Sequence, residues 1–340
     1  MIGLDATYSL GRNLSGVGVY SREILYGLAA MDDGLEWDWF YRSNRYFKAG
    51  WNGDDLPANA RRRLLLERWG SRRADLFHGL NQRLPLRRFR KQVATFHDLF
   101  VLTGEYSSPE FRERFTAQAR HAAEAADLVI AVSEFTARQV TRLLGVPKER
   151  IVVVPHGVVP RVLPDVAREK VVLCVGAIQR RKNQAGLVRA FRAMPADWRL
   201  VLAGSEGFEA GETLEAAREF GERILVTGYL SEAELAGWYA RASIFAFPSI
   251  DEGFGMPVLE AMAAGVPVIA GNRSALPEVC GDAAILINPL DEAELAGALE
   301  GLAKSPARLA ELTALGLVRA KDFSWQRAVL ETAAAYREIL

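Results

Sequence analysis

Two glutamates, Glu252 and Glu260, stand eight positions apart in the stretch DEGFGMPVLEAMAAGVP. The apolar run SIFAFPS precedes it and predicts a strand, so Glu252 lies in the loop between that strand and a helix expected at about 256–264. Pro257 suits the first position of this helix because it has no N–H to lose. The unpaired N–H groups of a helix N-terminus favour an anion such as phosphate. The stretch therefore predicts an anion site, with Glu252 just outside the helix and Glu260 in its first turn.

The same stretch also has a purely structural interpretation. Glu260 would then only complement the dipole of the helix, and Gly253 and Gly255 would only form a turn. In the functional interpretation, the two glycines let a ligand approach the backbone closely. The spacing of the glutamates alone leaves both interpretations open.

Cations occupy a second strand-to-helix junction, VGAIQRRKNQAGLVRAF. Arg181 and Lys182 stand where a strand predicted at 170–177 is followed by a helix predicted at 182–194, and they can reach a phosphate bound there. A solvated basic turn would produce the same pattern. Two junctions that suit anions, both in the second half of the chain, favour a diphosphate that uses the two together.

Two further motifs lie in the first half of the chain. His97 and Asp98 follow a predicted apolar strand, and a histidine there would point into a cleft between two domains, although such a pair is often structural. Gly16 and Gly18 form a glycine-containing loop before a predicted helix. Ser21 stands where the pattern G-x-G-x-x-G requires its third glycine, so the NAD-binding fingerprint is absent.

Apolar strands alternate with helices along the chain, which predicts an α/β protein with parallel sheets covered on both faces. The strands are expected at 1–6, 36–42, 75–80, 92–98, 127–133, 151–157, 170–177, 198–204, 223–228, 243–249, 267–271 and 283–289. The helices are expected at 16–30, 109–126, 133–145, 182–194, 231–242, 256–264 and 323–340. The prolines of PHGVVPRVLPDVAREK interrupt the series, so two doubly wound domains are expected. Ligands bind such sheets beyond the carboxyl ends of the strands, where the candidate residues stand.

The composition excludes several classes of protein. The 42 Lys and Arg balance the 42 Asp and Glu, so no global field favours nucleic acid. Cys174 and Cys280 belong to no CxxC or Cys/His cluster, which argues against a disulfide framework and a structural zinc. The N-terminus lacks a signal-peptide pattern and no apolar run reaches the roughly 18 residues of a membrane span, so a cytoplasmic location is expected.

One segment, residues 57–92, is locally basic. It holds eleven Arg or Lys against Glu67 and Asp75, and its arginines are interleaved with Leu64, Leu65, Leu66 and Trp69. Such a surface could lie on anionic lipid at the inner face of a membrane, or approach a lipid diphosphate acceptor. The alternative is a solvated helical face with a buried leucine stripe.

In order and spacing, the motifs of the whole chain resemble the retaining GT-B glycosyltransferases of family four, and among them bacterial mannosyltransferases of polysaccharide assembly. The motifs that carry this resemblance are SGVGVYSREIL, FHDL, VSEFTARQV, IVVVPHGV, VGAIQRRKN, LVTGYLSEAEL, FPSIDEGFGMPVLEAMAAGVPVIA, SALPEVCGDAAILINPLD and FSW. The resemblance implies two Rossmann-like domains facing across a cleft. The acceptor-side domain would span 1–160 and the nucleotide-sugar-binding domain 161–323, with a C-terminal helix at 324–340 packing back on the first.

The resemblance also implies roles for the candidate residues. Glu260 should hold the ribose hydroxyls of a nucleotide-sugar donor, and Glu252 should bind the transferred sugar and orient its anomeric carbon. Lys182, with Arg181, should neutralise the charge on the leaving diphosphate. His97 should contact the donor sugar from the other domain. The other donor-binding residues implied are Gly253, Phe254, Gly255, Met256, Pro257 and Val258 around the diphosphate and sugar, Gly176 at the start of the basic junction, Tyr229 and Leu230 beside the nucleobase, and Gly16 and Gly18 beside the phosphates and the acceptor.

One departure from the family pattern concerns the basic junction. Many members place an arginine directly after the glycine at position 176, where this chain has Ala177, so Arg181 is expected to carry more of the phosphate charge. The family transfers with retention of configuration, and its favoured mechanism is front-face attack, with the leaving phosphate oxygen taking the acceptor's proton. Basic side chains and a helix N-terminus can stabilise a diphosphate without a cation, and the chain has no D-x-D, so neither a metal nor a cofactor is expected.

The identities of donor and acceptor follow only from the resemblance. It favours a hexose donor, with GDP-mannose ahead of a UDP- or ADP-linked glucose, and a glycan, lipid-linked or small-molecule acceptor. A sugar-nucleotide epimerase of the same architecture and a catalytically silent sugar-nucleotide-binding protein are alternatives. A dehydrogenase is disfavoured by the missing dinucleotide fingerprint.

Overall fold

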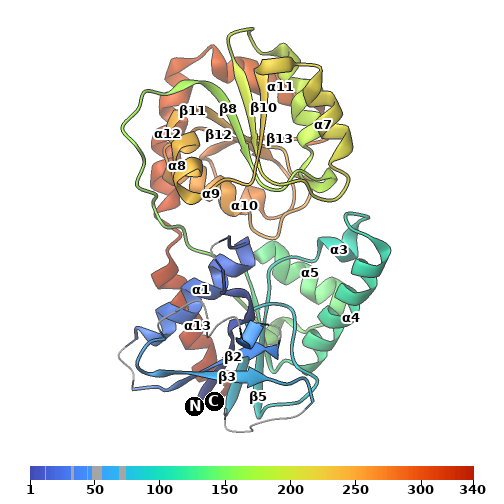
Figure 1. The fold of residues 1–340 in the computed structure, drawn as a ribbon, viewed down its shortest axis with the longest axis vertical. Coiled ribbons are helices and arrows are strands. Elements are labelled where there is room, and N and C mark those ends of the chain that lie inside the picture. Colours follow the sequence, from blue (N-terminus) through green and yellow to red (C-terminus); the bar gives the residue numbers. More distant parts are fainter. Residues whose placement is uncertain (12, 32–33, 44, 48–55, 69–73) are drawn as a thin grey trace. The chain divides into compact units, whose positions relative to one another are not determined.

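The computed structural model describes the chain except for residues 12, 32–33, 44, 48–55 and 69–73 (Figure 1). Its contacts divide the chain into two compact units. Unit 1 comprises Met1–Thr103, Pro109–Gly157 and Ser324–Leu340, and unit 2 comprises Gly104–Ser108 and Val158–Phe323. Five residues of the basic segment, 69–73, lie outside the described residues, and they include Trp69, Arg72 and Arg73.

Unit 1 contains a parallel sheet whose described strands follow the order β3-β2-β1-β4-β5-β6-β7. The strands are β1 (Ile2–Asp5), β2 (Trp37–Arg42), β3 (Ala60–Leu65), β4 (Leu76–Gly79), β5 (Lys91–Phe96), β6 (Leu128–Ala131) and β7 (Ile151–Val153). The helices are α1 (Gly16–Ala29), α3 (Phe100–Thr103), α4 (Pro109–Ala125), α5 (Glu134–Leu144) and α13 (Trp325–Ile339). Strands β1, β2, β4 and β6 are buried at every position, as expected for parallel strands covered on both faces.

Unit 2 contains a parallel sheet in the order β10-β9-β8-β11-β12-β13. The strands are β8 (Glu169–Val175), β9 (Arg199–Ala203), β10 (Ile224–Gly228), β11 (Ala242–Phe247), β12 (Val268–Gly271) and β13 (Ala284–Ile287). The helices are α6 (Gln184–Ala190), α7 (Gly211–Arg218), α8 (Glu232–Arg241), α9 (Met256–Ala263), α10 (Leu276–Cys280), α11 (Glu292–Ala303) and α12 (Pro306–Ala320). In Figure 1, α7 and α11 lie on one side of this sheet and α8, α9 and α12 on the other.

Both sheets have the doubly wound strand order, in which the chain reverses direction across the sheet beside its first strand. In unit 2 this switch point lies between β8 and β11, which are paired neighbours. The expected alternation of strands and helices is thus confirmed, as are all twelve expected strands. An open parallel sheet binds its ligand at the switch point, so the loops after β8 and β11 are the candidate ligand-binding segments of unit 2.

The structure corrects two expectations about unit 1. Residues 60–65 of the basic segment form the strand β3, so the expected helical face with a leucine stripe is wrong there. Gly16 and Gly18 do not form a loop before a helix, because α1 begins at Gly16. The side chain of Ser15 caps this helix by accepting a hydrogen bond from the Gly18 N–H at 3.3 Å, which starts the helix two residues earlier than a glycine loop would allow.

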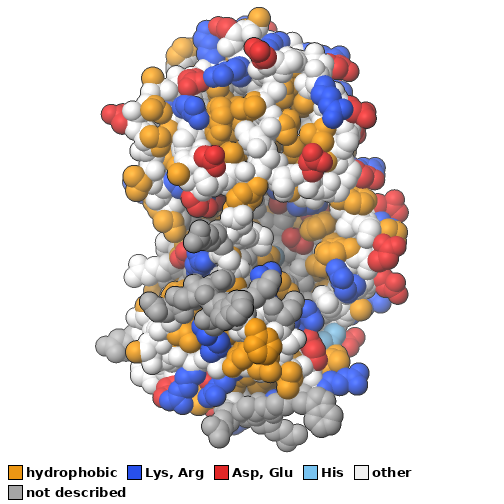
Figure 2. Space-filling view, in the orientation of Figure 1, with side chains coloured by type: hydrophobic (Ala, Val, Ile, Leu, Met, Phe, Trp, Pro, Cys, Tyr) orange, Lys and Arg blue, Asp and Glu red, His pale blue; other side chains and the backbone are white. Residues whose placement is uncertain are grey.

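Carboxylates from outside the basic segment offset part of its positive charge. Arg61 pairs with Glu36, Arg63 with Asp38 and Arg88 with Asp127, and all three carboxylates come from outside the segment. Figure 2 likewise shows cationic and anionic side chains interspersed over the visible face of the chain. The guanidinium groups of Arg61, Arg63 and Arg88 therefore do not form an uncompensated row of positive charge.

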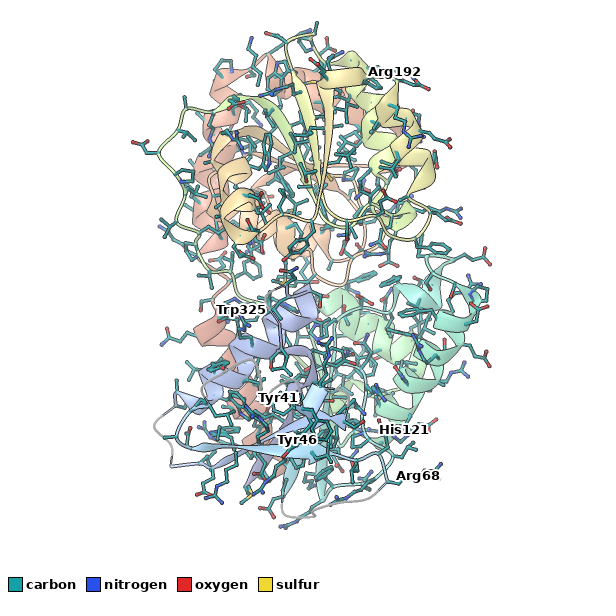
Figure 3. The ribbon with its side chains drawn as sticks, viewed as in Figure 1. Tyr41, Tyr46, Arg68, His121, Arg192 and Trp325 are labelled. Atoms are coloured by element: carbon teal, nitrogen blue, oxygen red, sulfur yellow. The ribbon has the colours of Figure 1, made fainter. Side chains whose placement is uncertain are left out.

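The last helix, α13, belongs to unit 1 and packs on α1. Trp325, labelled in Figure 3, begins this helix, and its ring lies 6.2 Å from the ring of Tyr20. Near the other end of the helix, the hydroxyl of Tyr336 lies 2.6 Å from Nδ1 of His78. The remaining ring nitrogen of His78 lies 2.7 Å from the hydroxyl of Thr95. Buried polar contacts therefore attach α13 to the centre of the sheet, where unpaired polar groups would be costly.

Candidate functional site

The loops that follow β8 and β11 are joined by hydrogen bonds between their backbones and side chains. The N–H of Ile250 donates to the carbonyl of Arg181 at 2.9 Å, and the hydroxyl oxygen of Ser249 lies 3.3 Å from the same carbonyl oxygen. A guanidinium N–H of Arg181 in turn donates to the carbonyl of Asp251. The two junctions singled out in the sequence are therefore adjacent in space, at the switch point of the unit 2 sheet.

Glu252 receives three polar contacts from these two loops. Its Oε1 lies 3.0 Å from Nη1 of Arg181, 3.2 Å from Nζ of Lys182 and 2.9 Å from the hydroxyl of Ser249. Burial alone would raise the pKa of this carboxyl, but the charges of Arg181 and Lys182 and the Ser249 hydrogen bond outweigh it and hold the pKa at about 2. Glu252 is thus an ionised carboxylate that is only 9% exposed. All three contacts reach the same oxygen, which leaves Oε2 as an acceptor for a ligand hydroxyl.

Lys182 is held in place by its surroundings rather than by the ion pair alone. Its ammonium lies 4.6 Å from the centroid of the Phe247 ring, a cation–π contact at the end of β11. Gly176, which the sequence marked as the start of the basic junction, has a φ of +130°, and a Cβ there would lie 2.9 Å from Nζ of Lys182. A glycine at this position therefore avoids a steric clash with the ammonium of Lys182.

The helix expected after Glu252 exists and begins at Met256, as predicted, but Pro257 and Glu260 each lie later in it than expected. Gly255 has a φ of +103° and is the N-cap residue, so α9 begins at Met256 and Pro257 is its second residue. Glu260 is consequently the fifth residue of the helix and lies in its second turn, not its first. Phe254 is buried against the ring of Phe323, 5.8 Å away. Within the first turn of α9, Pro257 has no N–H and the N–H of Val258 donates to the carbonyl of Gly255 at 3.0 Å. The positive end of the helix dipole still favours an anion at this end of α9.

Glu260 lies between two polar side chains in unit 2. Its Oε2 accepts a hydrogen bond from the hydroxyl of Tyr239 at 3.0 Å, and its Oε1 lies 3.2 Å from Nη2 of Arg161. Burial raises the pKa of this carboxyl, although Arg161 opposes the shift. Tyr229 and Leu230 follow β10, beyond Gly228, and Tyr229 is 53% exposed, so its ring is available for stacking.

His97 lies in unit 1, in a cluster of buried rings. Its Nε2–H donates to the carbonyl of Leu80 at 3.0 Å, and its Nδ1 lies 3.4 Å from Nε2 of His156. The ring of Tyr20 meets it edge-on at 4.7 Å. Burial lowers the pKa of His97 to about 4, so the imidazole is neutral near pH 7. Both ring nitrogens already contact groups of unit 1, so the ring would have to exchange its contact with His156 to bind a ligand hydroxyl. The neutral ring carries no charge with which to offset a phosphate.

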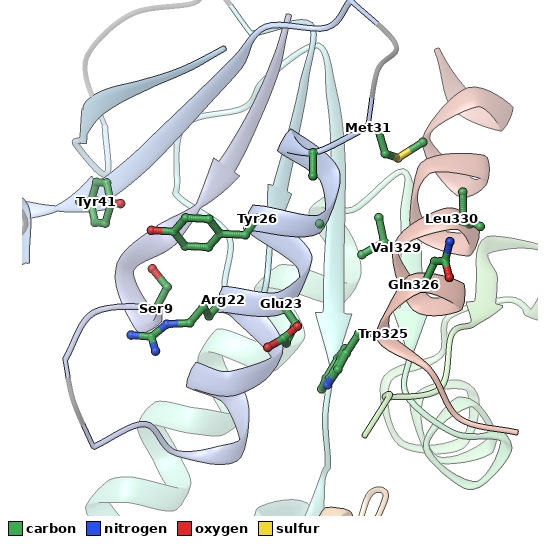
Figure 4. A pocket seen from close by; sticks show the side chains of 12 residues that line it. Ser9, Arg22, Glu23, Tyr26, Met31, Tyr41, Trp325, Gln326, Val329 and Leu330 are labelled. Atoms are coloured by element: carbon green, nitrogen blue, oxygen red, sulfur yellow. The ribbon is translucent and has the colours of Figure 1, made fainter. Parts of the chain in front are cut away.

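Unit 1 also contains a cavity of about 780 Å³ that the sequence did not indicate. Figure 4 shows it around α1 and α13, with Arg22, Glu23 and Tyr26 on the first helix and Trp325 and Gln326 on the second. A mixture of apolar walls and a few charged or amide groups suits a polyhydroxylated molecule. Adjacent Arg and Glu residues, such as Arg22 and Glu23, are common in helices, so the sequence alone could not predict this cavity.

Within the described residues, no group of three or more His, Cys, Asp or Glu side chains is placed to hold a metal ion. No helix in the described part of the chain has both the length and the apolar composition to cross a bilayer.

Comparison with known proteins gives matches over both units. The family model "Glycosyltransferase Family 4" matches residues 15–162, and the model "Glycosyl transferases group 1" matches residues 169–305. The O-antigen chain mannosyltransferase B of Escherichia coli is 33% identical over 98% of this chain and 98% of its own. The MMP alpha-(1->4)-mannosyltransferase of Mycolicibacterium hassiacum is 32% identical over 62% of this chain and 54% of its own.

Solved structures resemble this chain over its whole length. Sucrose-phosphate synthase from Thermosynechococcus elongatus has a TM-score of 0.78 at 23% identity, covering 99% of this chain and 98% of its own. Anabaena Alr3699/HepE in complex with UDP and glucose has a TM-score of 0.77 at 19% identity, covering 99% of both chains. At these identities the likeness shows that the fold is shared.

Proposed function

This chain belongs to the family 4, group 1 glycosyltransferases, enzymes with two Rossmann-like domains of the GT-B fold, and from that premise we propose that it transfers mannose from GDP-mannose. The acceptor in this proposal is a glycan or lipid-linked glycan in polysaccharide assembly. The names of the O-antigen mannosyltransferase and of the other similar mannosyltransferase support both parts. The observation that carries the proposal is the ionised Glu252 beside two buried cations at the switch point of unit 2.

Each group of that junction has a role in the proposal. The first turn of α9 and the cations Arg181 and Lys182 bind the diphosphate and offset the charge that grows on it as the sugar leaves. The free Oε2 of Glu252 accepts hydrogen bonds from the hydroxyls of the transferred sugar, and Glu260 accepts them from the ribose. Tyr229 stacks beside the nucleobase, and His97 contributes a hydrogen bond to the donor sugar.

Metal independence and retention of configuration are further parts of the proposal. Two fixed cations and a helix N-terminus supply the positive charge that a divalent ion would otherwise supply to a leaving diphosphate. Retention by front-face attack requires the leaving phosphate oxygen to take the proton of the acceptor hydroxyl. The anomeric proton of the product, observed by NMR, distinguishes retention from inversion.

The donor assignment is tested by thermal-shift measurements against GDP-mannose, UDP-glucose and ADP-glucose, with EDTA present throughout. GDP-mannose is expected to raise the melting temperature most, because a ligand that binds only the folded state stabilises it by about 2.7 kcal/mol at a hundred times its Kd. An equal or larger shift with another nucleotide sugar would contradict the choice of donor. A shift that appears only when a divalent metal in excess of the EDTA is added would contradict metal independence.

Peripheral membrane contact through the basic segment 57–92 is a weaker part of the proposal. Leu64, Leu66 and Leu86 of this segment are exposed beside its arginines, which favours contact with an anionic surface. Liposome co-sedimentation is expected to retain more protein as the anionic lipid fraction rises, and less as the salt concentration rises. Sedimentation that does not depend on anionic lipid would contradict the proposed membrane contact. It would not affect the proposed glycosyl transfer.

An epimerase of the same architecture would act on the donor alone. Incubation with GDP-mannose and no acceptor is therefore expected to leave the sugar configuration unchanged. A released nucleotide sugar of altered configuration would favour the epimerase.

A further inference from the structure

Arg161 joins Glu260 to a part of the chain that the sequence did not connect with the donor. It lies in the segment between β7 and β8, whereas Glu260 lies on α9, and both belong to unit 2. Its Nη2 lies 3.2 Å from Oε1 of Glu260, its other terminal nitrogen pairs with Glu232 on α8, and its guanidinium lies 5.8 Å from the centroid of the Tyr239 ring. The side chains of Arg161 and Glu260 are 18% and 20% exposed, so the pair is largely withdrawn from water.

The contacts to Glu260 fix its carboxylate at two points. Arg161 holds Oε1, and the hydroxyl of Tyr239 holds Oε2. A carboxylate has about four lone-pair positions, so each oxygen keeps one acceptor position beyond these contacts. Two acceptor positions on one fixed plane match the two hydroxyl donors of a vicinal diol.

From this geometry we propose that Arg161 is a positioning residue for donor binding, because it orients the Glu260 carboxylate towards the ribose diol of the nucleotide. The inference rests on the proposed role of Glu260 at the ribose. Arg161 acts through Glu260 and needs no contact with the nucleotide. Tyr239 alone would hold one oxygen and would leave the carboxylate free to rotate about that bond.

Arg161 has a second effect, on the ionisation of Glu260. The ionisable groups facing this carboxyl are Arg161 from the joining segment and Tyr239 and Glu232 from α8. Burial raises the pKa of Glu260, Arg161 lowers it and the charge of Glu232 raises it. Loss of Arg161 should therefore raise this pKa further. Since only the ionised carboxylate can accept from both hydroxyls, donor binding would then fail at a higher pH.

The test measures the Kd of GDP by calorimetry, from about pH 8 down to about pH 5. R161Q is expected to weaken binding roughly tenfold or more, the usual scale for a hydrogen bond to a charged group, and to move the pH at which binding is lost upward. R161K should restore most of the affinity, because it returns the charge. In a transfer assay, R161Q should raise the donor KM and leave kcat within a few fold.

Two control variants separate this effect from a general disturbance of unit 2. R241Q removes an arginine of α8 whose guanidinium lies over Trp238, and it should leave the Kd and its pH profile unchanged. E260Q should weaken binding at every pH without a titration. The melting temperature of each variant shows whether it is folded, and R161M, which also lacks the charge, replaces R161Q in the comparison if the latter is not.

The outcomes distinguish this inference from the proposed function. Tighter GDP binding by R161Q would mean that Arg161 covers Glu260, and it would overturn the inference. An unchanged Kd and pH profile in R161Q, together with weak binding in E260Q, would also overturn it while leaving Glu260 at the ribose. Unchanged binding in E260Q would instead remove the ribose role of Glu260 from the proposed function.

Discussion

Replacing Glu252 with glutamine is expected to lower kcat for sugar transfer by roughly 100-fold to 1000-fold, the loss seen when a fixed electrostatic group is removed from an active site. The amide keeps the size of the side chain but not its negative charge. The interaction with Arg181 and Lys182 that holds the side chain in place is thereby weakened. Initial rates with saturating donor and acceptor measure the effect, and the donor KM should change much less than kcat.

Glutamine is a better probe at this position than alanine. Alanine would leave Arg181 and Lys182 buried without their counter-charge, and breaking a buried pair in this way costs about 3–5 kcal/mol. Glu212→Gln provides the matched control, because Glu212 pairs with Arg189 at the surface, and its activity should equal that of the wild type. A folded E252Q enzyme that keeps a large share of wild-type turnover would contradict the assignment of Glu252.

Acid is expected to destabilise unit 1 at a higher pH than unit 2. Burial lowers the pKa of His78 to about 3, that of His97 to about 4 and that of His156 well below its usual value. In the unfolded chain these rings titrate near pH 6.5. Below that pH the unfolded state binds more protons than the folded state, so the free energy of unfolding falls as the pH falls. Each histidine contributes about 1.4 kcal/mol per pH unit until its folded-state pKa is reached.

Unit 2 has a different pH window. The pKa of Glu252 is about 2 in the folded state, below its ordinary value of 4.5. The stability that it contributes is therefore present above about pH 4.5 and is lost only as the pH falls from there towards 2. Amide hydrogen exchange, measured by mass spectrometry between about pH 7 and 4.5, should show unit 1 losing protection first.

A histidine variant provides the control for this prediction. His97→Gln should make the loss of unit 1 stability shallower by about one proton, whatever its effect at neutral pH. Loss of protection in unit 2 before unit 1 would contradict the assignment of the acid-sensitive groups. So would a flat stability profile of unit 1 between about pH 6.5 and 4.5.

The sequence predicted the fold because its signals were local. Apolar runs such as 170–177 and 243–249 are continuous and lie between helical patterns, and each became a buried parallel strand. The helices α3, α7, α10, α11 and α12 were not among the predicted ones. The apolar residues of α11 have a weak helical period, and α10 has only five residues, too few to show one. Strand β3 was missed because the three arginines of ARRRLL hide its alternation.

The site could be predicted only in part. Residues that follow strands, such as Glu252 and Lys182, were identified because topology places them at one edge of the sheet. The start of α9 at Met256 was also predicted, but Pro257 was expected at its first position and Glu260 in its first turn, and both lie later in the helix. Arg161 could not be predicted either, because its contact with Glu260 joins residues about a hundred positions apart.

Unit 1 is assembled from both ends of the sequence, with unit 2 between them. During synthesis on the ribosome, the strands of unit 1 emerge first, but α13 follows only after the whole of unit 2. Until then Tyr20, His78 and Thr95 lack the helix that Trp325 and Tyr336 bring to them. Unit 2 can complete its sheet before α13 has been synthesised, whereas unit 1 cannot fold completely without α13. Unit 2 should therefore reach its native state before unit 1.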